Sequence, residues 1–154
     1  MNTVRQMLRP RNKKVLTVSP QASVADAFTL MAEHDVGALV VVDEAGVSGI
    51  VTERDYVRKV GLSGRLAHET TVGEIMTSKV LYVRPEQSVD DCMALMTDKH
   101  VRHLPVIDEG KLIAVISIRD VVAHIISEQS FTIEQLENYI LDRHPALVNA
   151  TASL

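Results

Sequence analysis

The sequence predicts an α/β (α+β) protein made of two βαββα repeats that pack as a pseudo-twofold pair, with short N- and C-terminal helices. Residues 15–60 align with residues 80–125 without a gap, and about a third of the aligned positions are identical. Both copies contain apolar residues at helical spacing and short strand-like apolar runs. The chain has two Phe, three Tyr and no Trp. Its core must therefore be aliphatic, which suits small α/β layers.

Each copy predicts the same order of elements: a strand, a capped helix, a hairpin and a second helix. Ser23 and Ser88 are predicted N-caps, with Asp26 and Asp91 at the third helical position, as in a capping box. Neither copy could bury its sheet face alone, so we expect the two to pack sheet against sheet. The strands are predicted at residues 15–18, 38–42 and 47–51, and at residues 80–83, 104–107 and 112–116. The second helices are predicted at residues 56–60 and 121–126.

The remaining segments connect or flank the repeats, which span residues 15–60 and 80–126. The N-terminal segment is predicted to hold a short capped helix from Thr3 to Leu8 and then a solvated basic stretch. The linker contains a capping-box pattern at Thr71 and Glu74 that predicts a short helix. The C-terminal helix segment is predicted to hold a capped amphipathic helix from Thr132 to Leu141, and the tail after it is expected to be disordered. These segments are residues 1–14, 61–79, 127–144 (with Ile133, Leu136, Tyr139 and Ile140 on the apolar face) and 145–154.

Composition argues against several classes of function. The net charge of −4 disfavours nucleic acid as a partner, because that partner requires a basic face. No apolar run approaches a membrane span, and the N-terminus lacks a leader pattern, so we expect a cytoplasmic protein without membrane contact. Cys92, the single cysteine, is predicted to be a buried, inert thiol. His100 and His103 lack a second ligand pair for a metal, and no catalytic constellation indicates an enzyme or a catalytic cofactor.

The distinctive feature is the turn that follows the last strand of each copy. Thr52 and Asp55 occupy this turn in the first copy, and Ser117 and Asp120 occupy it in the second. One interpretation is a further capping box, since Ser23 and Asp26 have the same spacing. The other is a ligand site, because strand ends and helix N-termini in α/β folds bind phosphate-bearing ligands. The residues alone leave both interpretations open.

The span from Val15 to Ile126 resembles a tandem CBS-domain pair, also called a Bateman module. Gly49, Thr52 and Asp55 match the family signature G-h-x-[ST]-x-x-[ND], and residues 102–108 (RHLPVID) resemble a second family segment. The end of the chain, residues 131–140, is similar to that of small stand-alone bacterial members. The resemblance implies a sensor of adenosine-containing ligands, in which the signature Asp holds the ribose and basic residues of the other copy reach the phosphates.

Carried over by position, the resemblance implies two binding sites. The second departs from the family pattern, because Ala114 replaces the signature Gly and Gly-Ala replaces the basic pair, so the first should fill preferentially. The first site comprises Thr52, Asp55, Arg119, Arg102 and His103. The second comprises Ser117, Asp120, Arg54, Gly37 and Ala38.

The expected function is regulatory binding of an adenine nucleotide, AMP, ADP, ATP or NAD(H), without catalysis. The alternative is a structural dimerisation module with non-functional clefts. In both cases the apolar second helices and C-terminal helix lead us to expect a homodimer. A regulated partner protein is not identified by the sequence.

Overall fold

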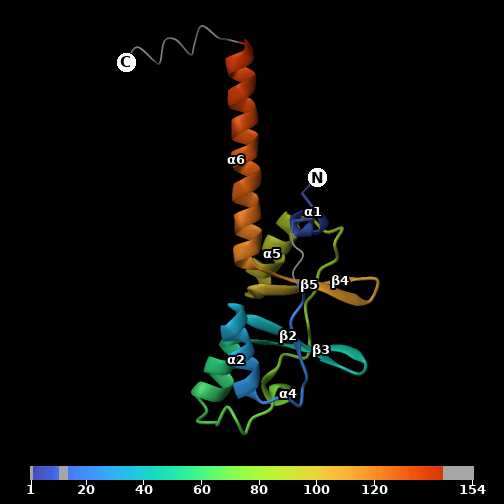
Figure 1. The fold of residues 1–154 in the computed structure, drawn as a ribbon, viewed down its shortest axis with the longest axis vertical. Coiled ribbons are helices and arrows are strands. Elements are labelled where there is room, and N and C mark those ends of the chain that lie inside the picture. Colours follow the sequence, from blue (N-terminus) through green and yellow to red (C-terminus); the bar gives the residue numbers. More distant parts are fainter. Residues whose placement is uncertain (1, 11–13, 144–154) are drawn as a thin grey trace.

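The structure is a computed structural model that describes residues 2–10 and 14–143 (Figure 1). The predicted disordered tail and part of the basic stretch at residues 9–14 lie outside the described residues. The first repeat contains β1 (Thr17–Val18), α2 (Val24–His34), β2 (Ala38–Asp43), β3 (Gly46–Thr52), α3 (Glu53–Tyr56) and the π-helical turn η1 (Val57–Gly61). The second contains α5 (Val89–Lys99), β4 (His103–Asp108), β5 (Lys111–Ser117) and α6 (Ile118–Arg143). Two short helices precede the repeats: α1 (Val4–Leu8) and α4 (Val72–Ile75).

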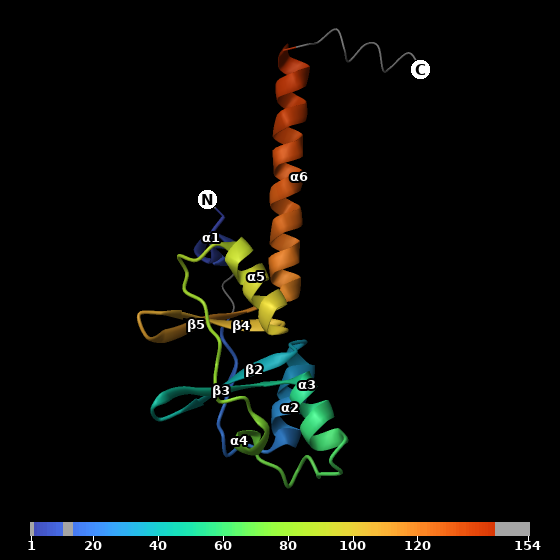
Figure 2. The same cartoon turned by 180° about the vertical axis from the view of Figure 1, so that it is seen from behind.

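Each repeat forms its own small sheet. In the first, β1 is parallel to β2, and β2 is antiparallel to β3. In the second, β4 and β5 form an antiparallel hairpin with a register shift at the position equivalent to that of the first. The sheets of the two repeats lie next to each other, with the helices of each repeat on the outer side (Figures 1 and 2). This arrangement agrees with the predicted sheet-against-sheet packing.

The strand predicted at residues 80–83 is wrong, because only Val83 pairs, in a single parallel bridge with Val106. Val83 N–H donates to the Pro105 carbonyl, and the Ile107 N–H donates to the Val83 carbonyl. One step further along a parallel ladder, residue 105 would have to donate to the carbonyl of Leu81. Proline has no N–H, so the ladder ends there. The first repeat has Val40 at this position and keeps a two-residue strand.

The predicted helix caps are present, with one difference. The hydroxyls of Ser23 and Ser88 accept hydrogen bonds from the N–H groups of Asp26 and Asp91, both at 3.0 Å. The reciprocal bond, in which the cap N–H would donate to the Asp26 or Asp91 carboxylate, is absent from both helices. Each is therefore capped by the serine alone and lacks the second half of the predicted box.

The leading segments of the two repeats are exchanged. α1 precedes the first repeat but packs into the core of the second, and α4 precedes the second repeat but packs into the core of the first. The backbone bonds match: Val4 N–H donates to the Gln87 carbonyl, and Val72 N–H donates to the Ala22 carbonyl, both at 2.9 Å. Both helices begin where predicted, and both have a capping box.

Two separate aliphatic cores result from this exchange. The core of the first repeat lies between its sheet and helices α2 and α4, and that of the second lies between its sheet and helices α1, α5 and α6. Cys92 is fully buried in the second core, as predicted. Burial raises the pKa of its thiol to about 11, with a smaller contribution from the negative charge of Asp91. The thiol is therefore protonated at neutral pH.

The C-terminal region forms one helix where the sequence predicted two. α6 runs without interruption from Ile118 to Arg143 and projects beyond the body of the protein (Figures 1 and 2). Thr132, at the predicted start of the separate helix, instead donates its hydroxyl to the carbonyl of Glu128 at 3.0 Å. No Gly or Pro separates the two predicted helices, so no residue stops the first.

Gly49 allows the linker to cross over β3. Ile50 and Thr77 exchange two backbone hydrogen bonds of 3.0 and 2.9 Å, which holds the linker against this strand. A Cβ atom on Gly49 would lie 2.5 Å from Sδ of Met76 and 3.1 Å from the carbonyl oxygen of Thr77. The glycine of the signature is therefore explained by packing within the chain.

We predict that Gly49→Ala lowers the free energy of unfolding by about 1–3 kcal/mol, the usual cost of overpacking. Urea denaturation followed by circular dichroism measures this change. Gly61→Ala is the control, because an added Cβ there meets only the Tyr56 carbonyl oxygen, at 3.7 Å. Equal stability of Gly49→Ala and the parent would contradict this explanation.

Candidate ligand-binding site

The two signature turns lie at the carboxyl ends of β3 and β5, where Thr52 and Ser117 are the last strand residues. Both turns form complete capping boxes. Thr52 N–H donates to the Asp55 carboxylate at 2.9 Å, and Asp55 N–H donates to the Thr52 hydroxyl at 3.4 Å. Ser117 and Asp120 form the same two bonds at 2.8 and 3.2 Å. The capping interpretation of both turns is therefore confirmed. A ligand at either turn would have to bind to a carboxylate that already accepts a hydrogen bond from the cap N–H.

Asp55 is buried and already has partners for both carboxylate oxygens. Oδ2 accepts from the N–H and the hydroxyl of Thr52, and Oδ1 lies 3.0 Å from the Nζ atom of Lys59. Lys59 also donates to the carbonyl of Ile75, at the end of α4, at 2.7 Å. A ribose at Asp55 would have to displace or share this ammonium group. Lys59 was not among the site residues predicted from the sequence, although its i,i+4 spacing from Asp55 is typical of helical ion pairs.

The second turn lacks this lysine. The repeat places His124 at the position of Lys59, and the imidazole of His124 instead contacts the side-chain oxygen of Asn2. The two copies thus differ at the position four residues after the signature carboxylate. The first copy has an ammonium group there, and the second has an imidazole turned toward the N-terminal segment.

His103 lies where the two repeats meet. It pairs with Ser117 in the hairpin of its own repeat, and its ring would lie 3.2 Å from a Cβ atom on Gly37 of the other repeat. Burial lowers the pKa of His103, while the carboxylates of Glu53 and Asp120 raise it and Arg102 lowers it further. The structure therefore favours a neutral imidazole that has acidic neighbours from both repeats.

The other predicted site residues are distributed over both repeats. Ala38 pairs with Thr52 within the first repeat, although the resemblance assigned the two to different sites. Arg54 reaches the other repeat, as expected, but donates to the carbonyl of His100 at 2.8 Å. Arg102 and Arg119 are exposed and could approach a phosphate group. Glu53, which the sequence analysis did not consider, is the acidic neighbour of His103 from the first repeat.

Two further observations concern the part of the chain that is described. In residues 2–10 and 14–143, His, Cys, Asp and Glu side chains do not form a group of three or more that could hold a metal ion. Among the same residues, no helix has the length and apolar character needed to cross a membrane.

We predict that His103 makes folding sensitive to acid. An unfolded chain protonates histidine at about pH 6.5, whereas the folded state, with its lowered pKa, does so only at lower pH. Well above pH 6.5, the approximate pKa of the unfolded chain, His103 is neutral in both states. As the pH falls further, the unfolded state binds the proton first and stability is lost. His103→Gln should therefore lose less stability than the parent between about pH 7 and 5.5.

Urea denaturation at several pH values measures this difference. His68→Gln, which removes an exposed linker histidine, corrects for the general effect of losing one imidazole. If the parent instead gained stability relative to His103→Gln on acidification, the carboxylates of Glu53 and Asp120 would raise the pKa of His103 by more than burial lowers it.

Comparison with known proteins accounts for the repeat. A family model described as CBS domain matches residues 4–61 and 72–127. The mitochondrial CBS domain-containing protein CBSX3 of Arabidopsis thaliana is 39% identical over 147 residues, covering 90% of this chain and 71% of the relative. YhcV of Bacillus subtilis is 32% identical over 117 residues, covering 76% of this chain and 83% of the relative.

Solved structures agree with this match. A protein with CBS domains from Burkholderia ambifaria shares 53% identity at a TM-score of 0.80, covering 83% of this chain and 96% of that one. The CBS domain pair of protein MJ0100, solved with 5-methylthioadenosine and S-adenosyl-L-methionine, has a TM-score of 0.72. Its identity is 22%, covering 83% of this chain and 98% of that one, and at that level the likeness concerns the fold. Since the family model matches both repeats together with α1 and α4, the chain belongs to the CBS-domain family and contains a tandem CBS-domain pair.

Proposed function

We propose that the protein is a regulatory, non-catalytic module that binds an adenine nucleotide (AMP, ADP, ATP or NAD(H)) at the signature turns. The observation that carries this proposal is the placement of Thr52 with Asp55, and of Ser117 with Asp120, at two equivalent strand ends. The CBS pair of MJ0100, which has the same fold, was solved with two adenosine-containing ligands. That likeness supports the chemical class of ligand.

In the first site Asp55 would accept hydrogen bonds from the ribose hydroxyls once Lys59 releases its carboxylate. The Lys59 side chain is 43% exposed, so it can turn toward solvent. Its ammonium group would then be available to a phosphate, together with the exposed guanidinium groups of Arg102 and Arg119. A ligand with ribose and phosphate would thus exchange an internal ion pair for charge-assisted bonds of its own.

In the second site the position of Lys59 is taken by His124, whose imidazole is turned toward Asn2. His103, which the resemblance assigned to the first site, pairs with Ser117 of the second turn. The carboxylates of Asp120 and Glu53 lie near His103 and would repel a phosphate placed there. We therefore expect the adenosine part of a ligand, rather than its phosphates, to dominate binding at the second site. This preference agrees with the expectation that nucleotides fill the first site preferentially.

One observation favours the alternative function, a dimerisation module with non-functional clefts. Asp55 is satisfied by Thr52 and Lys59 without any ligand. In that case the signature carboxylate only caps a helix and anchors the turn.

We also propose that the protein forms a homodimer through α6. Six apolar residues follow one side of this helix at intervals of 4, 4, 7, 3 and 4, and each is at least 39% exposed. The last three intervals match the a/d spacing of a coiled coil, in which such a stripe packs against a second helix. A second copy of α6 would supply that helix. The six residues are Ile118, Val122, Ile126, Ile133, Leu136 and Ile140.

We predict that Asp55→Asn weakens binding of the favoured nucleotide by at least about tenfold, because a charged acceptor for ribose hydroxyls is lost. Calorimetric titration of AMP, ATP and NAD measures the affinity. Asp26→Asn is one control, since Asp26 is at the same position of a helix with no assigned ligand. Glu74→Gln is a closer one, because the Glu74 carboxylate accepts the cap N–H of Thr71 at 2.7 Å, again with no assigned ligand.

A loss of affinity confined to Asp55→Asn, with all three variants folded, supports ribose binding. If Asp55→Asn binds as tightly as the parent and only loses about 0.5–2 kcal/mol of stability, as for a lost cap, the dimerisation alternative stands.

We predict that light scattering of the parent at micromolar concentration gives the mass of a dimer, and that Leu136→Glu shifts it to the monomer. The introduced charge would be buried between two α6 helices without a partner. Phe131→Glu is the matched control, because Phe131 is 61% exposed and Leu136 is 57% exposed, but Phe131 lies off the stripe. A monomeric parent, or equal effects of both variants, would contradict dimerisation through this stripe.

A further inference from the structure

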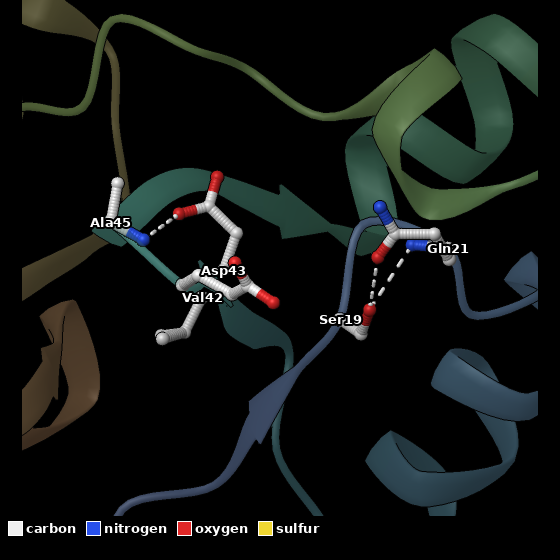
Figure 3. A pocket seen from close by; sticks show the side chains of 6 residues that line it. Ser19, Gln21, Val42, Asp43 and Ala45 are labelled. Carbon is white, nitrogen blue, oxygen red and sulfur yellow. Dashed lines mark hydrogen bonds between the residues drawn. The ribbon is translucent and has the colours of Figure 1, made fainter.

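A pocket of about 800 Å³ lies at the end of the first sheet opposite to the signature turn. Ser19 and Gln21 line one side of it, and Val42, Asp43 and Ala45 line the other (Figure 3). The register of the hairpin places Asp43 against Gly46 at this end, whereas Ala38 pairs with Thr52 at the far end. The pocket is therefore separate from the proposed nucleotide sites.

The second repeat has a guanidinium group at the equivalent place. The Nη2 atom of Arg5, in α1, lies 2.6 Å from a carboxylate oxygen of Glu86 and 3.3 Å from one of Asp108. At the repeat offset of 65, Glu86 corresponds to Gln21 and Asp108 corresponds to Asp43. Both counterparts line the pocket of the first repeat.

The exchange of α1 and α4 explains why only the second repeat has a guanidinium group at this place. Arg5 N–H donates to the Pro85 carbonyl at 2.9 Å, and Gly73 N–H donates to the Pro20 carbonyl at 2.9 Å. Pro85 and Pro20 are equivalent in the repeat, so Gly73 of α4 occupies the position of Arg5 of α1. Glycine has no side chain, and the space that a guanidinium group fills in the second repeat is left open in the first.

We propose that this pocket binds the guanidinium group of a small molecule of the arginine class. Asp43 uses Oδ1 to accept the Ala45 N–H at 2.8 Å, which fixes the carboxylate at the rim. Gln21 presents a side-chain carbonyl oxygen that accepts from the Ser19 hydroxyl at 2.6 Å. Glu44 adds a second carboxylate to the lining. A planar donor group with several N–H bonds suits these acceptors.

Size and charge agree with this assignment. Pockets for small ligands usually measure about 300–1,000 Å³, and this one lies within that range. The chain has a net charge of −4, which attracts a cation. The acidic lining is not the only support for a guanidinium ligand, because the other half of the molecule has the guanidinium group of Arg5 at the equivalent position.

The test is a titration of the full chain with L-arginine, followed by amide chemical shifts. L-citrulline, which has the same shape with a neutral urea group, is titrated in parallel. We expect L-arginine to shift the amides of Ser19, Gln21 and residues 43–45, and L-citrulline to leave them in place. Equal shifts with both compounds, or shifts located elsewhere, would overturn the proposal.

Two substitutions should change the affinity in opposite directions. Gln21→Glu recreates the carboxylate pair of the second repeat and should tighten L-arginine binding by about two- to fivefold, as expected for one exposed ion pair. Asp43→Asn keeps the bond to the Ala45 N–H and should weaken binding by a similar factor. Glu33→Gln, at the exposed C-terminal part of α2, changes the net charge equally and should have no effect. An unchanged affinity in Gln21→Glu would count against the site.

Removal of Arg5 supplies an independent check. Arg5→Ala empties the equivalent place in the second repeat, so L-arginine should then also shift the amides of Glu86 and Asp108. A capped peptide with one arginine distinguishes the source of the group: weaker binding than free L-arginine supports a small molecule, and tighter binding indicates a protein side chain instead. The absence of any new shifts in Arg5→Ala would contradict the equivalence of the two places.

Discussion

The exchange of α1 and α4 between the repeats is the constraint on which the rest of the structure depends. Each repeat is too small to bury its own sheet, and each core includes a helix that precedes the other repeat in the chain. Val4 and Val72, one from each exchanged helix, are fully buried at equivalent places. The first repeat therefore completes its core with α4, from the linker that follows it, whereas the second needs α1, from the far side of the first repeat. The core of the second repeat cannot form without the N-terminal segment of the chain.

This exchange also accounts for differences between the two copies. The linker lies against β3, and the proximity of Met76 requires glycine at position 49, whereas the second copy has Ala114 at the same place. A departure from the signature at Ala114 therefore says little about ligand affinity, because the signature glycine, Gly49, serves packing. In the same way, Arg5 and Gly73 have equivalent backbones, yet only Arg5 fills the space beside its hairpin.

Much of the fold follows from local sequence patterns. The repeat, the hairpins, the Ser23 and Ser88 caps and the short helices α1 and α4 are set by residues close together in the chain. The features that sequence reasoning missed depend on contacts between distant residues or on a missing stop signal. Pro105 ends the second parallel ladder, because it has no N–H to donate to the carbonyl of Leu81, which lies far from it in the sequence. α6 continues because residues 127–131 contain nothing to end it, and the contact of Lys59 with Ile75 depends on the exchanged position of α4.

The candidate site shows the same division. Spacing predicted both capping boxes, but a capping box and a ribose-binding carboxylate require the same residues, so spacing could not separate them. The structure adds what distinguishes the copies: an ammonium group at Asp55, and an imidazole turned toward Asn2 in the other repeat. A ligand that binds at Asp55 must compete with Lys59, which also contacts the carbonyl of Ile75 at the end of α4. Under the proposed function, binding there would loosen a contact between the first repeat and α4, and so would act on the linker that leads to the second repeat.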